Sequence, residues 1–256
     1  MLRRLLPASP LRLPLLQPVS RLAAPPLQLH TRSYARTQRP PPPARIMASS
    51  SAAAVPQPTY SSIPPPPPTR VLAPQDGALV WIDCEMTGLF PATDRILEVA
   101  CIITDGALNE LDEGVVWVIK TDKAVLDAMG DWCTKQHGAS QLTAACMSPA
   151  AREHADVRAA LLAYVRARVP HARSACLAGN TVHADAAFLK GEMPELIDHL
   201  HYRIVDVSTI KELVTRWYPA PAKRWQGGKG AHRALEDIRG SIEELRHYRE
   251  HAFVKP

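Results

Sequence analysis

The chain has 256 residues, with 30 basic and 25 acidic side chains, 25 prolines and five cysteines. No run approaches the roughly 18 consecutive apolar residues of a membrane helix, so we expect no membrane-spanning protein. The cysteines are odd in number and show no C-x-x-C spacing. This pattern fits neither a disulfide framework nor a zinc knuckle, and it favours a reducing compartment.

Charge and proline content divide the chain at Asp76, its first acidic residue. Residues 1–75 hold nine arginines, no lysine and 18 of the prolines, whereas the remainder carries 21 basic and 25 acidic side chains, a net charge of −4. An acid-free, arginine-rich beginning is typical of an organelle transit peptide, although a plain disordered tail is the alternative. We expect a disordered transit peptide and linker over 1–75, import into the mitochondrial matrix, and one domain over 76–252. Initiation at Met47 predicts a second, cytosolic form.

The predicted elements of the folded part begin with three strands in series, at 79–82, 95–104 and 115–119. Tight turns between them predict an antiparallel meander. Helical patterns follow at 125–136, 151–169, 184–189, 208–217 and 234–248. Two short apolar runs among the helices, 175–178 and 204–207, predict parallel additions to the sheet. The expected fold class is therefore α/β, a mixed five-stranded sheet covered by helices.

Two carboxylates follow the first strand at a spacing of two. Asp83 and Glu85 must point to the same face of an extended strand, because side chains alternate with a period of two. Adjacent carboxylate oxygens are ligands that Mg²⁺ and Mn²⁺ prefer. By itself an Asp-x-Glu triplet is also consistent with a solvated strand end.

Further acids occur at two other places in the chain. Asp185 opens a predicted helix that Asn180 or Thr181 can cap, although an acid there is also favoured by the helix dipole alone. His232 and Asp237 are five residues apart, about 140° around a regular helix. If both serve one site, His232 must lie on the glycine-rich loop that precedes the last helix.

Together these segments resemble the three motifs of the DEDDh family of 3′–5′ exonucleases, and within it the oligoribonucleases. The resemblance rests on the segments 81–89 (WIDCEMTGL), 131–133, 137–140, 201–213 (HYRIVDVSTIKEL) and 231–238 (AHRALEDI), and it runs from about 79 to 249. It implies an RNase H-like fold and hydrolysis of very short RNAs, such as dinucleotides, from the 3′ end to mononucleotides.

The chemistry of phosphodiester hydrolysis agrees with this resemblance. Two divalent cations, Mg²⁺ or Mn²⁺, activate water and stabilise the leaving oxygen. Four carboxylates are expected to hold them: Asp83, Glu85, Asp185 and Asp237. His232 is expected to take the proton from the attacking water, since the pKa of an imidazole is near 6.5.

The substrate side is implied by the family. Leu89 and Trp132 are expected to pack against bases, with His137 nearby. The terminal phosphate is expected to bind at Tyr202, Arg203 and Ser208, and at Thr181, where many relatives have serine. In relatives Tyr202 and Arg203 reach across a homodimer, so we expect this chain to be a homodimer that binds short single-stranded RNA. A net charge of −4 also favours short substrates over a long strand in a basic groove.

Two alternative functions follow from the same residues. A DNA 3′–5′ exonuclease of the same superfamily has the same acids, because nothing in them distinguishes ribose from deoxyribose. A catalytically silent RNA-binding protein is the other alternative, and it predicts the loss of at least one acid, whereas all four are present beside His232.

Overall fold

Most of the sheet is built from buried apolar segments. The computed structural model describes residues 59–227 and 234–254. Its strands are β1 (Leu79–Met86), β2 (Ile96–Thr104), β3 (Val115–Val118), β4 (Cys176–Gly179) and β5 (His201–Asp206). In the order β3-β2-β1-β4-β5, β1 pairs with β2 and β2 with β3 antiparallel, while β4 is parallel to both β1 and β5. The predicted mixed sheet is confirmed.

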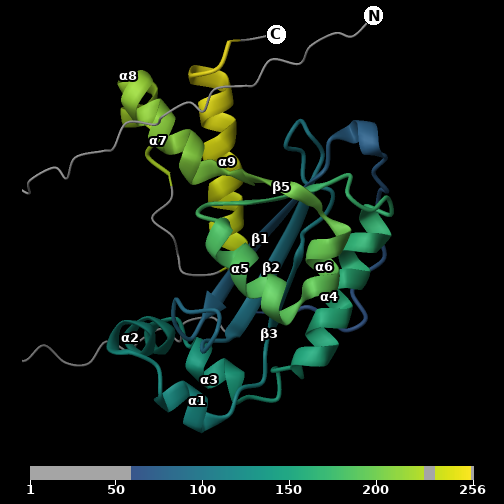
Figure 1. Cartoon of the computed structure of the whole chain (residues 1–256), viewed down its shortest axis with the longest axis vertical. Coiled ribbons are helices and arrows are strands. Elements are labelled where there is room, and N and C mark those ends of the chain that lie inside the picture. The colour runs from purple at the N-terminus through teal and green to yellow at the C-terminus, as the bar shows by residue number, and fades with distance from the viewer. Residues whose placement is uncertain (1–58, 228–233, 255–256) are drawn as a thin grey trace, which may run out of the picture. The chain divides into compact units, whose positions relative to one another are not determined.

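Helices cover both faces of this sheet (Figure 1). They are α1 (Lys123–Asp127), α2 (Asp131–Ala139), α3 (Leu142–Cys146), α4 (His154–Arg168), α5 (His183–Glu192), α6 (Pro194–His199), α7 (Val207–Trp217), α8 (Pro219–Arg224) and α9 (Ala234–His251). Within the described part of the chain, none of them combines the length and hydropathy of a membrane-spanning segment.

The alternation of side chains along β1 separates two cores. Ile82 and Cys84 face one way and pack with the buried side of α4, α5 and α6. Trp81 faces the other way and packs with α9 and with Val207 at the start of α7. Asp83 and Glu85 share the face of Trp81, since they lie two and four residues further along the strand. The sheet therefore presents both acids toward the side that α9 covers.

The helices differ from the predicted ones where glycine or proline intervenes. The single helix expected over 125–136 is two helices, because Gly130 takes extended backbone angles (φ −64°, ψ 160°) and becomes the N-cap of α2. The short helices α3, α6 and α8 were not predicted, and α6 and α8 each begin with a proline. Such short helices lack the repeated apolar spacing by which a helix is recognised in a sequence.

Part of the segment assigned to the N-terminal arm packs against the domain. We call residues 60–76 the strap. The backbone N–H of Ser61 donates to the Val116 carbonyl of edge strand β3 (2.9 Å), and Val116 N–H donates to the Ser61 hydroxyl (2.9 Å). Leu72 is buried in the core beside α4 and donates its N–H to the Arg168 carbonyl (2.7 Å). The folded part thus begins before Asp76. Of the expected transit peptide and linker (1–75), residues 1–58 lie outside the described residues.

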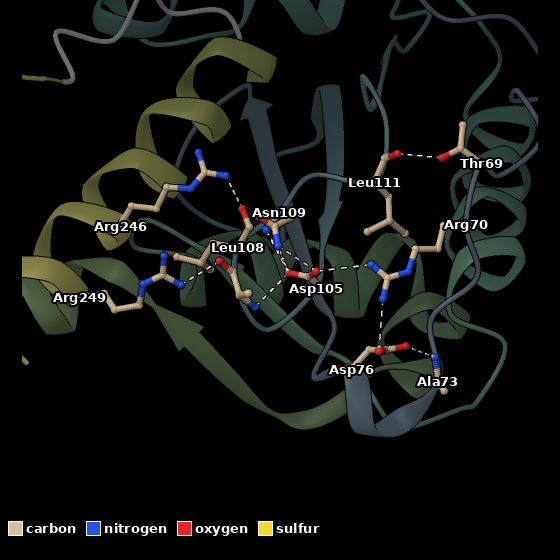
Figure 2. Close-up of polar contacts among 11 residues, drawn as sticks. Thr69, Arg70, Ala73, Asp76, Asp105, Leu108, Asn109, Leu111, Arg246 and Arg249 are labelled. Atoms are coloured by element: carbon tan, nitrogen blue, oxygen red, sulfur yellow. Dashed lines mark hydrogen bonds and ion pairs between the residues drawn. The ribbon is translucent and has the colours of Figure 1, made fainter. Parts of the chain in front are cut away.

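The strap ends on a polar cluster around Asp105, at the turn after β2 (Figure 2). Asp105 accepts hydrogen bonds from the backbone N–H groups of Ala107 (2.9 Å) and Asn109 (3.0 Å) and from the Asn109 side chain. Arg70 forms ion pairs with Asp105 (3.5 Å) and Asp76 (3.3 Å). Hydrogen-bond donors therefore face this carboxylate from both the turn and the strap.

Helix α9 holds the same turn from the other side (Figure 2). Arg249 donates to the Ala107 carbonyl (2.8 Å), and Arg246 donates to the Leu108 carbonyl. The turn is thus fixed between the strap and the C-terminal half of α9, the helix whose first turn carries Asp237.

Candidate active site

Three carboxylates from distant parts of the chain meet at the C-terminal end of β1. Asp83 and Glu85 come from β1, and Asp237 comes from the first turn of α9. One carboxylate oxygen of each lies within 4.8 Å of those of the other two. An all-oxygen group of this kind is suited to hard divalent cations.

Asp185 lies on the first turn of α5, next to this group but on the face of the sheet opposite to α9. Its Oδ1 accepts a hydrogen bond from the backbone N–H of Cys84 (2.9 Å), the residue between the two acids of β1. The Asp185 side chain is buried. Cys84 itself is buried in the core beside α4, as its position between the acids predicts.

Burial and neighbouring acids raise the pKa values of these carboxyl groups. Burial, and after it the carboxylate of Asp185, raises the pKa of Asp83 well above its usual value. Burial and then the charges of Glu98 and Asp237 raise the pKa of Glu85 to about 7. Burial raises the pKa of Asp185 to about 6, although the hydrogen bond from Cys84 acts in the opposite direction. Cations that neutralise these charges would relieve the repulsion.

Glu98 is an acid near the site that the sequence analysis missed. It lies on β2 directly opposite Glu85 in the register, so both side chains point to the same face, and it is 7% exposed. Its charge contributes to the raised pKa values of both Asp83 and Glu85. A signal existed in the sequence, because Glu98 is the one charged residue in the apolar run 96–103 and charged side chains are rarely buried without a role.

The loop after β1 carries Leu89, which is 81% exposed. Asp94 holds this loop by accepting hydrogen bonds from the Thr87 hydroxyl (3.0 Å) and the Phe90 backbone N–H (2.8 Å). Gly88 is required there, because a Cβ atom at this position would lie 2.4 Å from the Asp94 carboxylate. The loop is therefore fixed, while the apolar side chain of Leu89 stays free to contact a ligand.

Helix α2 places two predicted substrate residues very differently. Trp132, in its first turn, is 69% exposed, so its ring lies on the surface and not in the core. His137 is 2% exposed, and its Nε2 donates to the Met86 carbonyl at the end of β1 (2.8 Å). Its Nδ1 lies 3.9 Å from the Glu85 carboxylate. A buried ring held in this way fixes α2 against β1 and cannot form an open contact surface for a base.

The hydroxyl groups of Thr181 and Ser208 lie 3.0 Å apart, between the turn after β4 and the start of α7. Neither Asn180 nor Thr181 caps α5, since the N-cap residue is Val182 and no side chain bonds the cap. That predicted cap is wrong. The turn is instead fixed by longer-range bonds to the start of α7 and to α9.

Tyr202 and Arg203 lie on β5, the edge strand opposite β3. Tyr202 is 78% exposed and stacks on His201, with ring centroids 4.5 Å apart. The Arg203 guanidinium lies 5.0 Å from the centre of the Tyr202 ring. An exposed aromatic–cation pair on an open strand edge is a surface suited to binding. His232 lies outside the described residues, and α9 begins at Ala234.

Sequence comparisons agree with this geometry. Residues 80–245 match the model of a family described as an exonuclease. A probable oligoribonuclease of Schizosaccharomyces pombe is 54% identical over 172 residues, which cover 67% of each chain. The mitochondrial oligoribonuclease of Mus musculus is 47% identical over 178 residues, which cover 69% of this chain and 74% of the mouse protein.

A solved structure shares the fold. The zinc-bound complex of E. coli exonuclease I with single-stranded DNA aligns with a TM-score of 0.53 and 15% identity, over 70% of this chain. This chain spans 41% of the exonuclease I chain. At that identity the likeness concerns the arrangement of the sheet and helices alone.

Proposed function

The chain belongs to the oligoribonucleases of the DEDDh exonuclease family, and from this membership we propose how its residues act. It is a hydrolase, a 3′-to-5′ exoribonuclease that acts on short RNAs. The observation that supports this most directly is the meeting of Asp83, Glu85 and Asp237 within 4.8 Å. We propose that the substrates are mainly dinucleotides and RNAs of a few nucleotides, and that the products are mononucleotides.

Divalent cations fit the acids of the site. The donors are all carboxylate oxygens, and burial together with the charges of neighbouring acids raises their pKa values. We propose that Asp83, Glu85, Asp185 and Asp237 hold two ions, Mg²⁺ or Mn²⁺. When bound, such a pair supplies activation of water and neutralisation of the charge that develops on the phosphate and the leaving oxygen.

His232 is proposed as the general base that takes a proton from the attacking water. An imidazole is half protonated near pH 6.5, so its neutral form is available at neutral pH. The support for this role is the spacing from Asp237 that the family motif shares. Replacement of His232 by alanine is expected to flatten the low-pH limb of the rate profile, and an unchanged limb would assign the base elsewhere.

Base recognition is proposed for two exposed apolar side chains, Leu89 and Trp132. Stacking of a base on an aromatic ring contributes about 1–3 kcal/mol. Trp132→Ala is therefore expected to raise KM for a dinucleotide roughly 5- to 150-fold while changing kcat less. His137, expected to contact substrate, is better suited to positioning α2 and its Trp132, because its ring is buried against Met86.

Recognition of the terminal phosphate is proposed for Thr181 and Ser208 together with Tyr202 and Arg203. The support is the pair of hydroxyls 3.0 Å apart and the exposed cation on β5. We propose that the protein is a homodimer in which Tyr202 and Arg203 of each subunit reach the site of the other. The exposed edge of β5 gives them a position from which to do so.

The location proposed for the enzyme is the mitochondrial matrix. The support is the arginine-rich, acid-free arm and the mitochondrial assignment of the mouse relative. A second form that starts at Met47 is proposed for the cytosol. N-terminal sequencing of the protein from the two cell fractions tests both statements.

The function is tested by incubating the full chain with 5′-labelled RNAs of two to ten nucleotides, with Mg²⁺, with Mn²⁺ and with a chelator. We expect the dinucleotide to be hydrolysed fastest, rates that fall with length, and no hydrolysis with chelator. A deoxyribose dinucleotide in parallel separates the RNA enzyme from a DNA exonuclease. Binding of the RNAs without hydrolysis under all conditions would support the silent RNA-binding alternative instead.

A further inference from the structure

Asp206, the last residue of β5, makes more hydrogen bonds than a helix cap requires. As N-cap of α7 its Oδ1 accepts the backbone N–H of Ser208 (3.0 Å), which is ordinary capping. The same oxygen also accepts the backbone N–H of Thr181 (2.9 Å), 25 residues earlier in the chain. Its Oδ2 accepts from Nδ1 of His183 (3.1 Å), and its side chain is 10% exposed. These two additional bonds join the start of α7 to the turn that precedes α5 and to the first residue of α5.

The bond to Thr181 holds that residue in an uncommon backbone conformation. Thr181 has a φ of 54°, in the left-handed region that a β-branched residue rarely adopts. Such a conformation persists only where the surroundings impose it. The Thr181 N–H is held by Asp206 Oδ1 and by the Ser208 hydroxyl (3.0 Å), so Asp206 acts directly on the strained position.

The hydroxyl pair is also fixed from the side of α9. The Ser208 hydroxyl donates to Oδ1 of Asn180 (3.1 Å). The Asn180 amide cannot flip, because its Nδ2 donates to Ser241 Oγ (2.9 Å) and to the acceptor-only carboxylate of Glu244 (3.2 Å). With its proton directed to Asn180, Ser208 is left to accept from Thr181, whose hydroxyl proton is the one that can turn toward an incoming ligand.

We propose that Asp206 is a positioning residue that gives the enzyme its preference for substrates with a 5′-terminal phosphate. The inference rests on the proposed function, in which the internal phosphodiester of a dinucleotide lies at the acids and the Thr181–Ser208 pair takes the remaining, terminal phosphate. Asp206 itself does not touch the phosphate. It turns its two oxygens toward N–H groups and sets the backbone of Thr181, and thereby places the Thr181 hydroxyl beside that of Ser208, where the Thr181 proton can turn toward the phosphate.

The test compares two substrates in each variant, a diadenylate with a 5′ phosphate and the same dinucleotide without it. In the wild-type enzyme we expect kcat/KM to favour the phosphorylated substrate. Asp206→Ala is expected to lower this ratio about 10- to 100-fold, through KM for the phosphorylated substrate, because the oxygen that accepts both backbone N–H bonds is lost. Asp206→Asn keeps an oxygen that accepts both backbone N–H bonds, so its ratio should stay within about threefold of wild type.

The control is Asp122→Ala, which also removes an aspartate from a helix N-cap, that of α1, where it makes no side-chain cap bond. If Asp206→Ala slowed hydrolysis of both substrates but kept the wild-type ratio of their kcat/KM values, Asp206 would act only as a helix cap. That result would overturn the proposal. If Asp206→Asn lowered the ratio of the two kcat/KM values as much as Asp206→Ala does, the proposal would also be overturned. The negative charge of Asp206, and not its hydrogen-bond geometry, would then determine the preference. A wild-type enzyme that cleaves both substrates equally well overturns this inference alone, whereas one that cleaves neither overturns the proposed function.

Discussion

Two aspartates lie at opposite ends of the β1–β2 pair and meet opposite surroundings. Asp105 follows β2, beside the start of β1, where Leu79 pairs with Thr104. Although burial acts in the other direction, hydrogen bonds from the backbone and side chain of Asn109 lower its pKa. Asp83 lies toward the other end of β1, where burial and then the charge of Asp185 raise its pKa.

The difference between the two aspartates lies in the groups that surround each carboxylate. N–H donors and a guanidinium face Asp105, so its charge is satisfied within the protein (Figure 2). Asp83 is buried and other acids face it, so both its surroundings and its neighbours disfavour its charged form. The two clusters contain the same chemical group, and burial together with the neighbouring groups decides whether its pKa is raised or lowered.

The largest expected effect comes from Asp83→Asn. Loss of a cation ligand should lower hydrolysis of a dinucleotide by about three orders of magnitude or more. Thermal stability without cations should stay the same or rise, because one repelling charge is removed. The measurements are kcat/KM and Tm by circular dichroism. Asp105→Asn is the matched control and should keep its turnover, and near-normal turnover in Asp83→Asn would contradict the metal assignment.

The acid cluster should also make the cation-free protein less stable as pH rises. The pKa values of Glu85 and Asp185 are about 7 and about 6 in the folded chain, above the usual 4.5 and 3.8. Between those limits the folded chain binds more protons than the unfolded chain, so their contribution is complete below about pH 4 and is lost as pH rises toward 7. We expect Tm in chelator to fall on the order of 10 °C from pH 5 to pH 8.

Two comparisons isolate the source of that pH dependence. Glu85→Gln should show a shallower decrease in Tm, because one titrating carboxyl is gone. Mg²⁺ should raise Tm more at pH 8 than at pH 5, since protons compete with the ion for the same oxygens. Equal stabilisation at both pH values would indicate that the ion binds elsewhere.

At the other end of the sheet, Asp105→Ala should lower stability and leave the chemistry intact. The turn loses its acceptor for the N–H groups of Ala107 and Asn109, which we expect to reduce the free energy of unfolding by about 1–2 kcal/mol at pH 7. Because the pKa of Asp105 is lowered on folding, its contribution is present above about pH 4 and is lost at lower pH. Urea unfolding at pH 7 and pH 3 tests this, and an equal difference at both would contradict it.

The smallest effect is expected for Arg70→Ala, on the strap. Its side chain is about half exposed and its two ion pairs are 3.3 and 3.5 Å long, so water and salt screen both. The free energy of unfolding should change by no more than about 0.5 kcal/mol in urea titrations. Leu72→Ala, which removes a buried side chain from the same strap, should lower it by about 2–4 kcal/mol. Equal effects would mean that charge, and not burial, attaches the strap.

The sequence contains the parts of the site that depend on local periodicity. Asp83 and Glu85 share a face because a strand has a period of two, and this holds in whatever fold contains the strand. The sheet was predictable for the same reason, since long apolar runs such as 95–104 identify buried strands. The loop Leu89 and the helix-start Trp132 were identified through family motifs, and their exposed side chains agree with a surface role.

Only the tertiary structure decided which groups face one another across long sequence separations. Nothing near Asp206 in the sequence indicates that it holds Thr181, and nothing near His137 indicates that its ring is buried against Met86. The strap likewise has the composition of a disordered linker, yet Leu72 fills a place in the core. Local spacing determines the direction of a side chain relative to its own element, whereas its partners depend on how separate elements pack, and that is a property of the whole folded chain.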